Sequence, residues 1–403
     1  MRFWVGLIVA GITATYVLTA QFVAPDVLLL ARVKAHTREE LARLPNCSCL
    51  ETVRREHKEQ GAAARALRDV LRLEVLYSDR REYYAFPGES QFTQSHPSSF
   101  TAGGTIGNGH FALFLSEIAS ERGLSYEYKG RERMQGRELA RWDYRVPLSG
   151  SGHVINLGRG DSKVGMTGSF WADPATHEIV RIQMAADEIP PTMLVMSSET
   201  WIDYAHTNLG GQEYLLPQSA GMRLLKFTGE ESLNRIEFTH CRLFTAHSSI
   251  SFGAGESFPG FGEGSALEKR ELPPGLPIIV KLTTPIDGNA VVGALLEGTV
   301  EGTVSYKKRV VIPDGSVVRG RVRRLEDRSG TFAVSLEFTD LEAGEMRYRF
   351  FADLQSVDGM PGVRRTGSPA AELPGVGTFV IEGSRVNVPA GLRMVWKTRL
   401  LGE

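Results

Sequence analysis

Residues 168–174 have the sequence GSFWADP, and residues 179–182 have the sequence IVRI. We expect one strand over 166–172 and a second over 178–185, because Phe, Trp, Val and Ile favour strands. The residues between them, Asp173-Pro174-Ala175-Thr176, form a good turn with Pro at its second position. The stretch therefore predicts an antiparallel hairpin, on which the rest of the fold prediction is built.

Further strands and two helices are expected on either side of this hairpin. Residues 27–44 carry Leu and Val at helical spacing between charged residues, which predicts an amphipathic helix that ends at Pro45. Residues 111–118 also have helical spacing and could form a lid over a cavity. Strands are predicted within 49–59 and at 70–77, 141–146, 201–206, 214–216, 222–227 and 234–244. With 43 Gly among 403 residues, the chain is predicted to be mainly β and rich in turns.

A Gly-rich stretch divides the chain. Residues 253–264 combine Gly with Ser, Pro and Phe and lose the strand periodicity, so we predict a linker over 253–272. It separates a first domain, 27–252, from a second, 273–403. Strands of the second domain are predicted at 278–282, 295–304, 309–312, 317–323, 331–338, 346–354 and 393–399. Their Gly, Pro and Asp turns predict a small β-barrel or sandwich.

Composition and motifs argue against several classes of function. Lys and Arg number 46 and Asp and Glu 47, so no long-range field attracts nucleic acid. Residues 103–110 are rich in Gly but have neither the dinucleotide fingerprint nor the phosphate-loop spacing. Ser149, Ser151 and His153 form no nucleophile elbow, and the nine histidines are scattered singly. We expect no nucleic-acid partner, no catalytic residues, no metal and no cofactor.

The N-terminus has the features of an export signal. Arg2 is followed by residues 3–20, an apolar stretch without a charge. Ala20 offers an acceptable but imperfect cleavage site, and the stretch is just long enough to span a bilayer if it is left uncut. A cleaved signal peptide and a retained N-terminal anchor over 1–20 both stay open, the second with membrane contact through 3–20. Either one predicts export to the periplasm or cell envelope.

The chain has three cysteines, Cys47, Cys49 and Cys241. In an oxidising compartment they allow one disulfide and one free thiol. A bridge between Cys47 and Cys49 would close a small, strained ring, so we expect a long-range pair that includes Cys241. We predict that this pair is Cys49 with Cys241.

The order of the predicted elements resembles a known family. An export signal, an amphipathic helix leading into a first strand, and a meander containing GSFWADP and IVRI are similar to the outer-membrane lipoprotein-sorting carriers. The resemblance covers residues 27–252. It implies an incomplete antiparallel β-barrel, or half-barrel, closed by helices over an apolar cavity. The disulfide and the second domain depart from the simplest carriers.

The second domain has a shorter resemblance. Residues 312–316, IPDGS, followed by Gly320, and residues 388–391, VPAG, are similar to the β-barrel of conjugation-channel scaffold proteins. A Pro-Gly turn between two strands accounts for the same residues. Both interpretations stay open.

Four apolar side chains are the candidates for a ligand site. Trp142, Tyr144, Phe170 and Ile182 could share one concave sheet face and form a pocket for an acyl chain. The alternative is that they fill the core between sheet and helices. We therefore predict an exported, non-enzymatic cell-envelope protein that binds a lipid or lipoprotein acyl chain and contacts other envelope proteins. The alternative is an envelope scaffold with a filled core and no lipid ligand.

Overall fold

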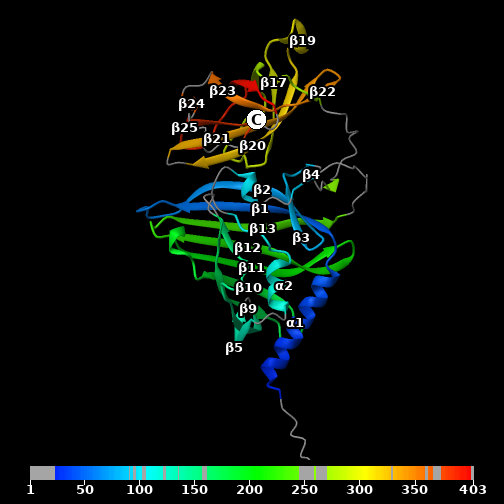
Figure 1. Cartoon of the computed structure of the whole chain (residues 1–403), viewed down its shortest axis with the longest axis vertical. Helices are drawn as coiled ribbons and strands as arrows, with labels where there is room; N and C mark the ends of the chain where they lie inside the picture. The colour runs from blue at the N-terminus through cyan, green and yellow to red at the C-terminus, as the bar shows by residue number, and fades with distance from the viewer. Residues whose placement is uncertain are drawn as a thin grey trace, which may run out of the picture.

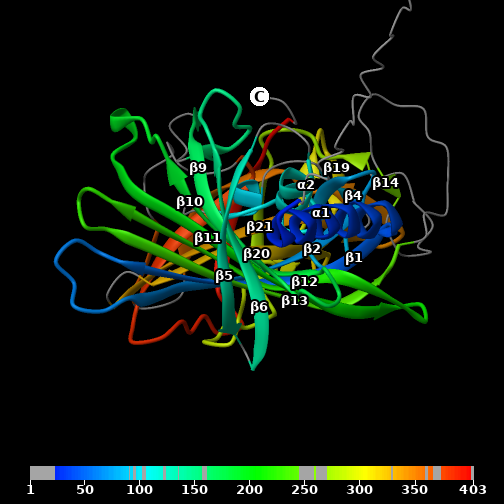
Figure 2. The ribbon, with the colours of Figure 1, turned by 90° about the horizontal axis from the view of Figure 1, so that it is seen from below.

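Ten antiparallel strands form one strongly curved sheet in the N-terminal half of the chain (Figures 1 and 2). They are β1 (Cys47–Lys58), β2 (Ala66–Ser78), β3 (Arg81–Ala85), β5 (Ser125–Met134), β6 (Arg137–Val146), β9 (Gly165–Ala172), β10 (Ile179–Asp187), β11 (Val195–Leu209), β12 (Gln212–Lys226) and β13 (Glu231–Leu243). Their order is β3-β2-β1-β13-β12-β11-β10-β9-β6-β5. The sheet is a half-barrel, open on one side, and the expected fold class, mainly β with an incomplete barrel, is confirmed.

This computed structural model describes residues 23–89, 91–93, 97–101, 106–120, 124–134, 136–156, 161–244, 258–259, 270–327, 330–358, 362–365 and 374–400. The predicted signal peptide or anchor, 1–20, lies outside them, as does most of the predicted linker, 253–272. Across the described ranges, no helix is both long and apolar enough to cross a membrane.

The hairpin predicted over 166–185 is present as β9 and β10, with Ala172 opposite Ile179. The Asp173 carboxylate closes the turn by accepting hydrogen bonds from the backbone N–H groups of Ala175, at 2.8 Å, and Thr176, at 3.3 Å. His177 takes a left-handed conformation, with φ of 66°. Short polar side chains that bond their own backbone are typical turn formers, which is why local sequence was enough to predict this element.

Two helices cover part of the concave face of the sheet (Figure 2). Helix α1 (Pro25–Arg43) begins with Pro, whose fixed φ suits a first helical position, and ends ahead of Pro45. Helix α2 (Leu113–Ala119) is short, contacts α1 and buries Phe114, Leu115 and Ile118 in the core. Arg38 of α1 donates a hydrogen bond to the Ala119 carbonyl at 3.0 Å. The predicted helices over 27–44 and 111–118 are thus confirmed to within a few residues.

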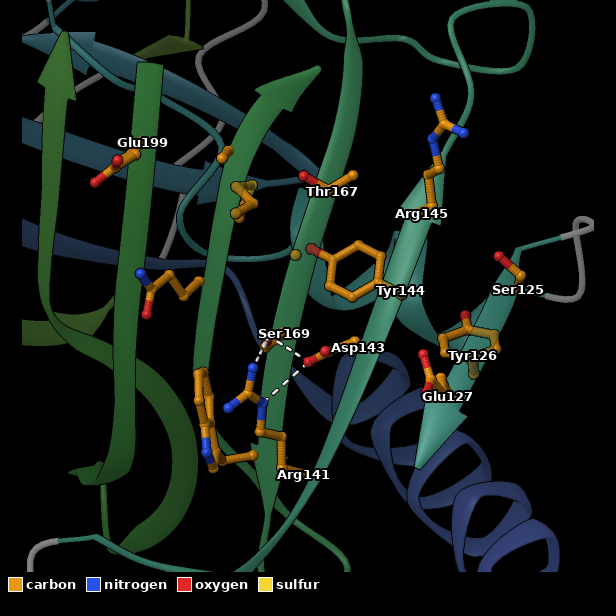
Figure 3. A pocket seen from close by; sticks show the side chains of 15 residues that line it. Ser125, Tyr126, Glu127, Arg141, Asp143, Tyr144, Arg145, Thr167, Ser169 and Glu199 are labelled. Atoms are coloured by element: carbon orange, nitrogen blue, oxygen red, sulfur yellow. Dashed lines mark hydrogen bonds and ion pairs between the residues drawn. The ribbon is translucent and has the colours of Figure 1, made fainter. Parts of the chain in front are cut away.

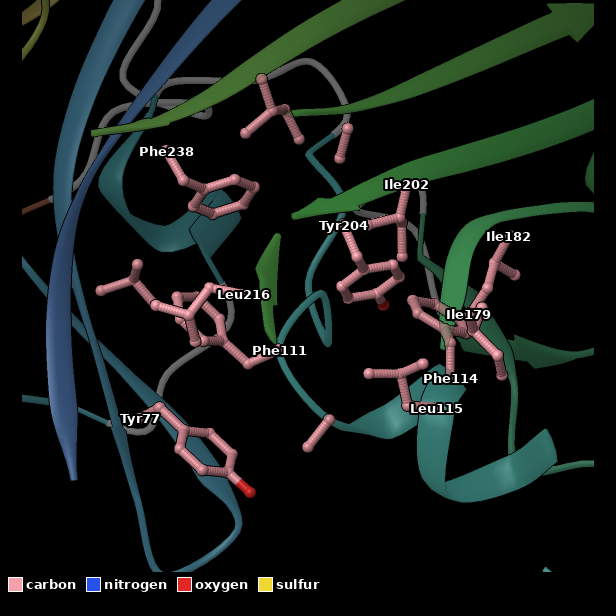
Figure 4. Close-up of a cluster of buried hydrophobic side chains, with 14 of the residues drawn as sticks. Tyr77, Phe111, Phe114, Leu115, Ile179, Ile182, Ile202, Tyr204, Leu216 and Phe238 are labelled. Atoms are coloured by element: carbon pink, nitrogen blue, oxygen red, sulfur yellow. The ribbon is translucent and has the colours of Figure 1, made fainter. Parts of the chain in front are cut away.

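The core of the half-barrel lies between these helices and the inward-facing side chains of the strands (Figure 4). Phe114 and Leu115 of α2 meet Ile182 and Ile202 from neighbouring strands. Because side chains alternate across a sheet, the opposite face carries most of the charged residues. The sheet in the N-terminal half of the chain therefore has a largely apolar concave face and a polar convex face.

A second sheet in the C-terminal half has its own core. Its strands are β15 (Arg270–Glu271), β16 (Pro277–Leu282), β17 (Leu295–Val300), β20 (Val317–Asp327), β21 (Thr331–Ala343), β22 (Met346–Arg349), β23 (Ala352–Asp358), β24 (Val363–Arg365), β25 (Val376–Glu382) and β26 (Arg393–Thr398). Phe338, Phe350 and Trp396 meet edge to face at its centre. Three two-stranded pairs complete the described strands: β4 (Gln91–Phe92) with β14 (Phe258–Pro259), β7 (Val154–Asn156) with β8 (Asp161–Lys163), and β18 (Val304–Tyr306) with β19 (Arg309–Ile312).

The two sheets touch at the edge of β2. β3 pairs with β2 only at its C-terminal end, from residue 74 on. Farther back along β2, the Val292 N–H donates to the Val70 carbonyl at 2.8 Å, and the Arg72 N–H donates to the Val292 carbonyl at 3.1 Å. Arg321 is buried beside this bridge and donates to a Glu89 carboxylate oxygen at 2.9 Å. The division into domains at 252 and 273 stays a prediction.

The predicted disulfide is confirmed. Cys49 on β1 and Cys241 on β13 are bonded across two neighbouring strands, 192 positions apart in sequence. Cys47 is a free, buried thiol. Burial raises its pKa to about 12, so at neutral pH it stays protonated and is a poor nucleophile toward the nearby disulfide.

Candidate functional site

A cavity of about 430 Å³ opens on the concave face of the half-barrel, beside the N-terminal end of α2. The apolar part of its wall comes from helix α2 and from strands β7, β9, β10 and β12 together with the loop before α2. This part consists of Ile106, Leu113, Phe114, Val154, Ile155, Val164, Met166, Met184, Ala186, Met222 and Leu224. The volume falls within the range of roughly 300–1,000 Å³ that is usual for small-molecule sites. Three of the side chains are Met, whose flexible thioethers adapt to ligands of irregular shape.

The mouth of this cavity carries exposed apolar side chains next to the exposed Asn108 and Asn156. The side chains of Leu113 and Val154, which line it, are 54% and 53% exposed. Met196, on the same strand as Ser198 of the cavity wall, is 52% exposed. Exposed apolar groups that continue a cavity outward are characteristic of a binding site.

One wall of the cavity is polar. His153 lines it, and its Nε2 lies 3.0 Å from a carboxylate oxygen of Glu117 on α2. The ring of Phe114 is stacked parallel to the imidazole at 5.7 Å between centroids. Nearby on the concave face, the Tyr144 hydroxyl is buried and has no hydrogen-bond partner among the described residues. The cavity thus combines a long apolar wall with one hydrogen-bonding edge.

The four side chains predicted to bind a ligand lie in the core beside the cavity. Trp142, Tyr144, Phe170 and Ile182 are only 0–4% exposed. The Trp142 and Phe170 rings are stacked at 5.3 Å, and none of the four lines the cavity. The structure therefore brings them together as packing partners, and their contact with a ligand stays a prediction.

A second, larger hollow of about 730 Å³ lies on the convex face (Figure 3). Its charged groups already bind one another. Arg141 bonds Asp143 at 3.0 Å and Glu132 at 2.9 Å, and Arg145 pairs with Asp187 at 2.9 Å. Tyr144 is the one predicted ligand residue among its lining. Because most of its charges are already paired and its opening is wide, this groove is a weaker candidate than the concave cavity.

A polar cluster around the half-buried Glu82 lies on the concave face toward β1. The Glu82 carboxylate accepts hydrogen bonds from the Tyr84 hydroxyl at 2.5 Å and from the backbone N–H groups of Gly109 at 2.7 Å and Phe111 at 2.9 Å. It thereby fixes the loop that leads into α2. Glu51 is fully buried, and neither of its carboxylate oxygens has a hydrogen-bond partner among the described residues. Burial, reinforced by the charge of Glu82, raises the pKa of Glu51 to about 8.

Sequence reasoning missed most of the cavity wall. Met166 and Met184 were within predicted strands, but nothing local marks which inward-facing residues remain uncovered by α2. A usable signal was the recurrence of Met on three strands of the sheet, Met166 on β9, Met184 on β10 and Met222 on β12, since Met is common at adaptable binding surfaces. Among the described residues, no cluster of His, Cys, Asp and Glu is suited to hold a metal ion.

Several solved structures are similar to about half of this chain. A putative outer-membrane lipoprotein-sorting protein domain from Vibrio parahaemolyticus is 13% identical over 54% of this chain and 94% of its own, with a TM-score of 0.29. A DUF1329 family protein from Desulfovibrio piger is 12% identical over 56% and 96%, with a TM-score of 0.30. A LolA superfamily protein from Nitrosomonas europaea is 12% identical over 55% and 95%, with a TM-score of 0.25.

The family that residues 27–252 resemble in sequence is thus found again among solved structures, as a similarity of fold alone. No protein-family model and no curated protein matches the sequence. The resemblance of the second domain to conjugation-channel scaffolds stays a prediction.

Proposed function

We propose that the half-barrel binds an acyl chain of a lipid or lipoprotein in the cavity on its concave face. The observation that carries this proposal is the cavity itself, a space of about 430 Å³ whose wall is largely apolar and whose mouth exposes Leu113 and Val154. Each methylene that enters it leaves water, which contributes about 0.8 kcal/mol. The His153–Glu117 pair would face the polar end of such a ligand. No reaction step is required, and the role is that of a non-enzymatic binding protein.

We also propose that the protein works outside the cytoplasm, in the periplasm or cell envelope. The Cys49–Cys241 disulfide supports this location, because disulfides persist in oxidising compartments. The apolar residues 3–20 supply the export signal or anchor. A carrier or holder of acyl chains in this compartment would meet other envelope proteins when it receives or delivers its ligand.

A bulky side chain inside the cavity should abolish lipid binding. Ala186 on β10 lines the cavity, and Ala186→Trp would fill the space that the ligand needs. Loss of room for two methylenes alone should weaken binding by more than about tenfold. Native mass spectrometry with lipid extraction, on the exported protein lacking residues 1–20, measures the bound lipid before and after the change.

The matched control is the preceding residue. Ala185 lies on the opposite, convex face of the same strand, so Ala185→Trp adds the same bulk without entering the cavity and should leave lipid binding unchanged. An apo mass for the unchanged protein, with no uptake of added lipid, would refute the proposal and favour the scaffold. Equal lipid in both variants would place any ligand elsewhere.

A further inference from the structure

The β18–β19 hairpin projects from the C-terminal sheet, at the end of the molecule opposite α1 (Figure 1). Its turn consists of Lys307 and Lys308, which have φ values of 49° and 65°. A two-residue turn with both residues at positive φ strongly favours Asn-Gly, because other side chains strain this backbone. Two lysines therefore occupy positions where Asn-Gly would give a more stable hairpin. Strain of this kind is a reason to look for a function.

The charges at this tip are unneutralised. Lys307, Lys308 and Arg309 are consecutive and exposed, and none forms an ion pair with another residue in the described part of the chain. The nearest carboxylates along the sequence are already engaged. Glu301 pairs with Arg393 at 2.9 Å, and Asp314 accepts the Gly302 N–H at 2.6 Å. In a chain with a net charge of −1, the tip is a compact site of three positive charges.

Apolar side chains flank these cations. Tyr306 is 37% exposed, and the Lys307 ammonium lies 5.3 Å from the centre of its ring. Val310, one residue after Arg309, is 61% exposed. Tyr side chains favour the boundary between water and lipid because the ring is apolar and the hydroxyl is polar. The combination of basic and amphipathic groups on one projecting tip matches an anionic lipid surface more closely than it matches a folded acidic protein.

We propose that the β18–β19 tip docks on the surface of an anionic lipid bilayer. Lys307, Lys308 and Arg309 would lie among the lipid phosphates, with Tyr306 and Val310 at the level of the headgroups. Each basic side chain near such a surface strengthens binding by about fivefold. The proposal concerns a face far from the concave cavity and holds whether or not that cavity binds an acyl chain.

Vesicle sedimentation tests this proposal with the chain that starts at residue 21. All members of both hydrophobic cores come after residue 28, so removal of residues 1–20 leaves every described element in place. The probes are vesicles of phosphatidylcholine alone and vesicles that mix phosphatidylcholine with phosphatidylglycerol. We expect binding to the anionic vesicles only, weakened by added salt, which screens exposed charges.

The decisive variant is Lys307→Asn combined with Lys308→Gly. This pair suits the turn better than the natural residues, so the hairpin persists while two charges are lost. Binding to anionic vesicles should fall by about 25-fold. The control, Lys281→Gln with Lys397→Gln, removes two exposed charges from β16 and β26 of the same sheet and should bind like the unchanged protein.

Two results would overturn the proposal. One is equal binding to neutral and anionic vesicles, or none to either. The other is unchanged binding by the Asn-Gly variant, which would locate the lipid contact away from the hairpin. Because acyl lipid in the cavity is measured separately by mass spectrometry, failure here leaves the carrier proposal untouched.

Discussion

Between pH 6.5 and 8 the protein should lose up to about 1.4 kcal/mol of stability per pH unit because of one carboxyl group, Glu51. Its pKa rises from 4.5 in the unfolded chain to about 8 in the buried site. In this window the folded protein binds a proton that the unfolded chain has released, so a rise in pH favours unfolding. Over the full interval between the two pKa values the loss reaches about 5 kcal/mol.

The lower limit of the window is set by a neighbouring histidine. His110 is fully buried, and burial lowers its pKa below 6.5, while the charge of Glu82 acts in the opposite direction. The stability that the neutral His110 contributes is present above pH 6.5 and is lost as the pH falls below it. Its dependence on pH is therefore opposite in sign to that of Glu51. The Tyr84 hydroxyl, which donates a hydrogen bond to the Glu82 carboxylate, has a pKa raised well above 10. It therefore does not titrate between pH 6.5 and 8. The interval from 6.5 to 8 therefore isolates Glu51 from its titrating neighbours on this face.

Urea unfolding at a series of pH values measures this slope. Glu51→Gln, which cannot ionise, should flatten it and make the protein more stable at pH 8. Glu237→Gln serves as the matched control, because Glu237 is an exposed carboxylate on β13, in the same sheet. A slope in the unchanged protein as flat as that of Glu51→Gln would show that the buried carboxyl has an ordinary pKa.

Removal of the disulfide should be the other large effect. Cys49 and Cys241 close a loop of 192 residues, for which the chain-entropy model gives about 5 kcal/mol, with measured losses usually of about 2–5 kcal/mol. Cys49→Ala with Cys241→Ala should lower the free energy of unfolding by this amount in urea. A thiol reductant should produce the same loss in the unchanged protein and none in the double variant.

Cys47→Ala separates the cross-link from simple core packing. Cys47 is also buried on the inner face of β1, so its replacement costs packing but leaves the bridge intact. This variant should stay sensitive to the reductant. An unfolding midpoint of the unchanged protein that does not move on reduction would mean that the bridge adds nothing to the stability of the half-barrel.

A structural feature could be predicted from the sequence when the residues that determine it are few or close together in the chain. The β9–β10 hairpin was predictable because Asp173 and Pro174 determine the turn on their own. The disulfide followed from the small number of cysteines and from ring strain. The hairpin depends on neighbouring residues, whereas the disulfide joins distant ones and was predictable because the chain has only three cysteines.

The inner face of β1 shows what local patterns leave out. Glu51 and Arg55 alternate there with Cys49 and Val53, so a pattern of hydrophobic residues is broken by charges that are in fact buried. Arg55 is neutralised by Asp69 of β2, with a shortest N···O distance of 2.5 Å. The cavity likewise depends on where α2 begins relative to five strands of the half-barrel. Such features arise only once distant segments meet.

The Val292 bridge to β2 has a consequence for association between molecules. Unsatisfied N–H and C=O groups along a strand edge are a template onto which another chain can add a strand. Val292 occupies these groups at residues 70 and 72 of β2, and the buried Arg321 closes off the surface next to them. The C-terminal sheet thus shields this part of the β2 edge from pairing with a strand of another molecule, and separation of the two sheets would expose it.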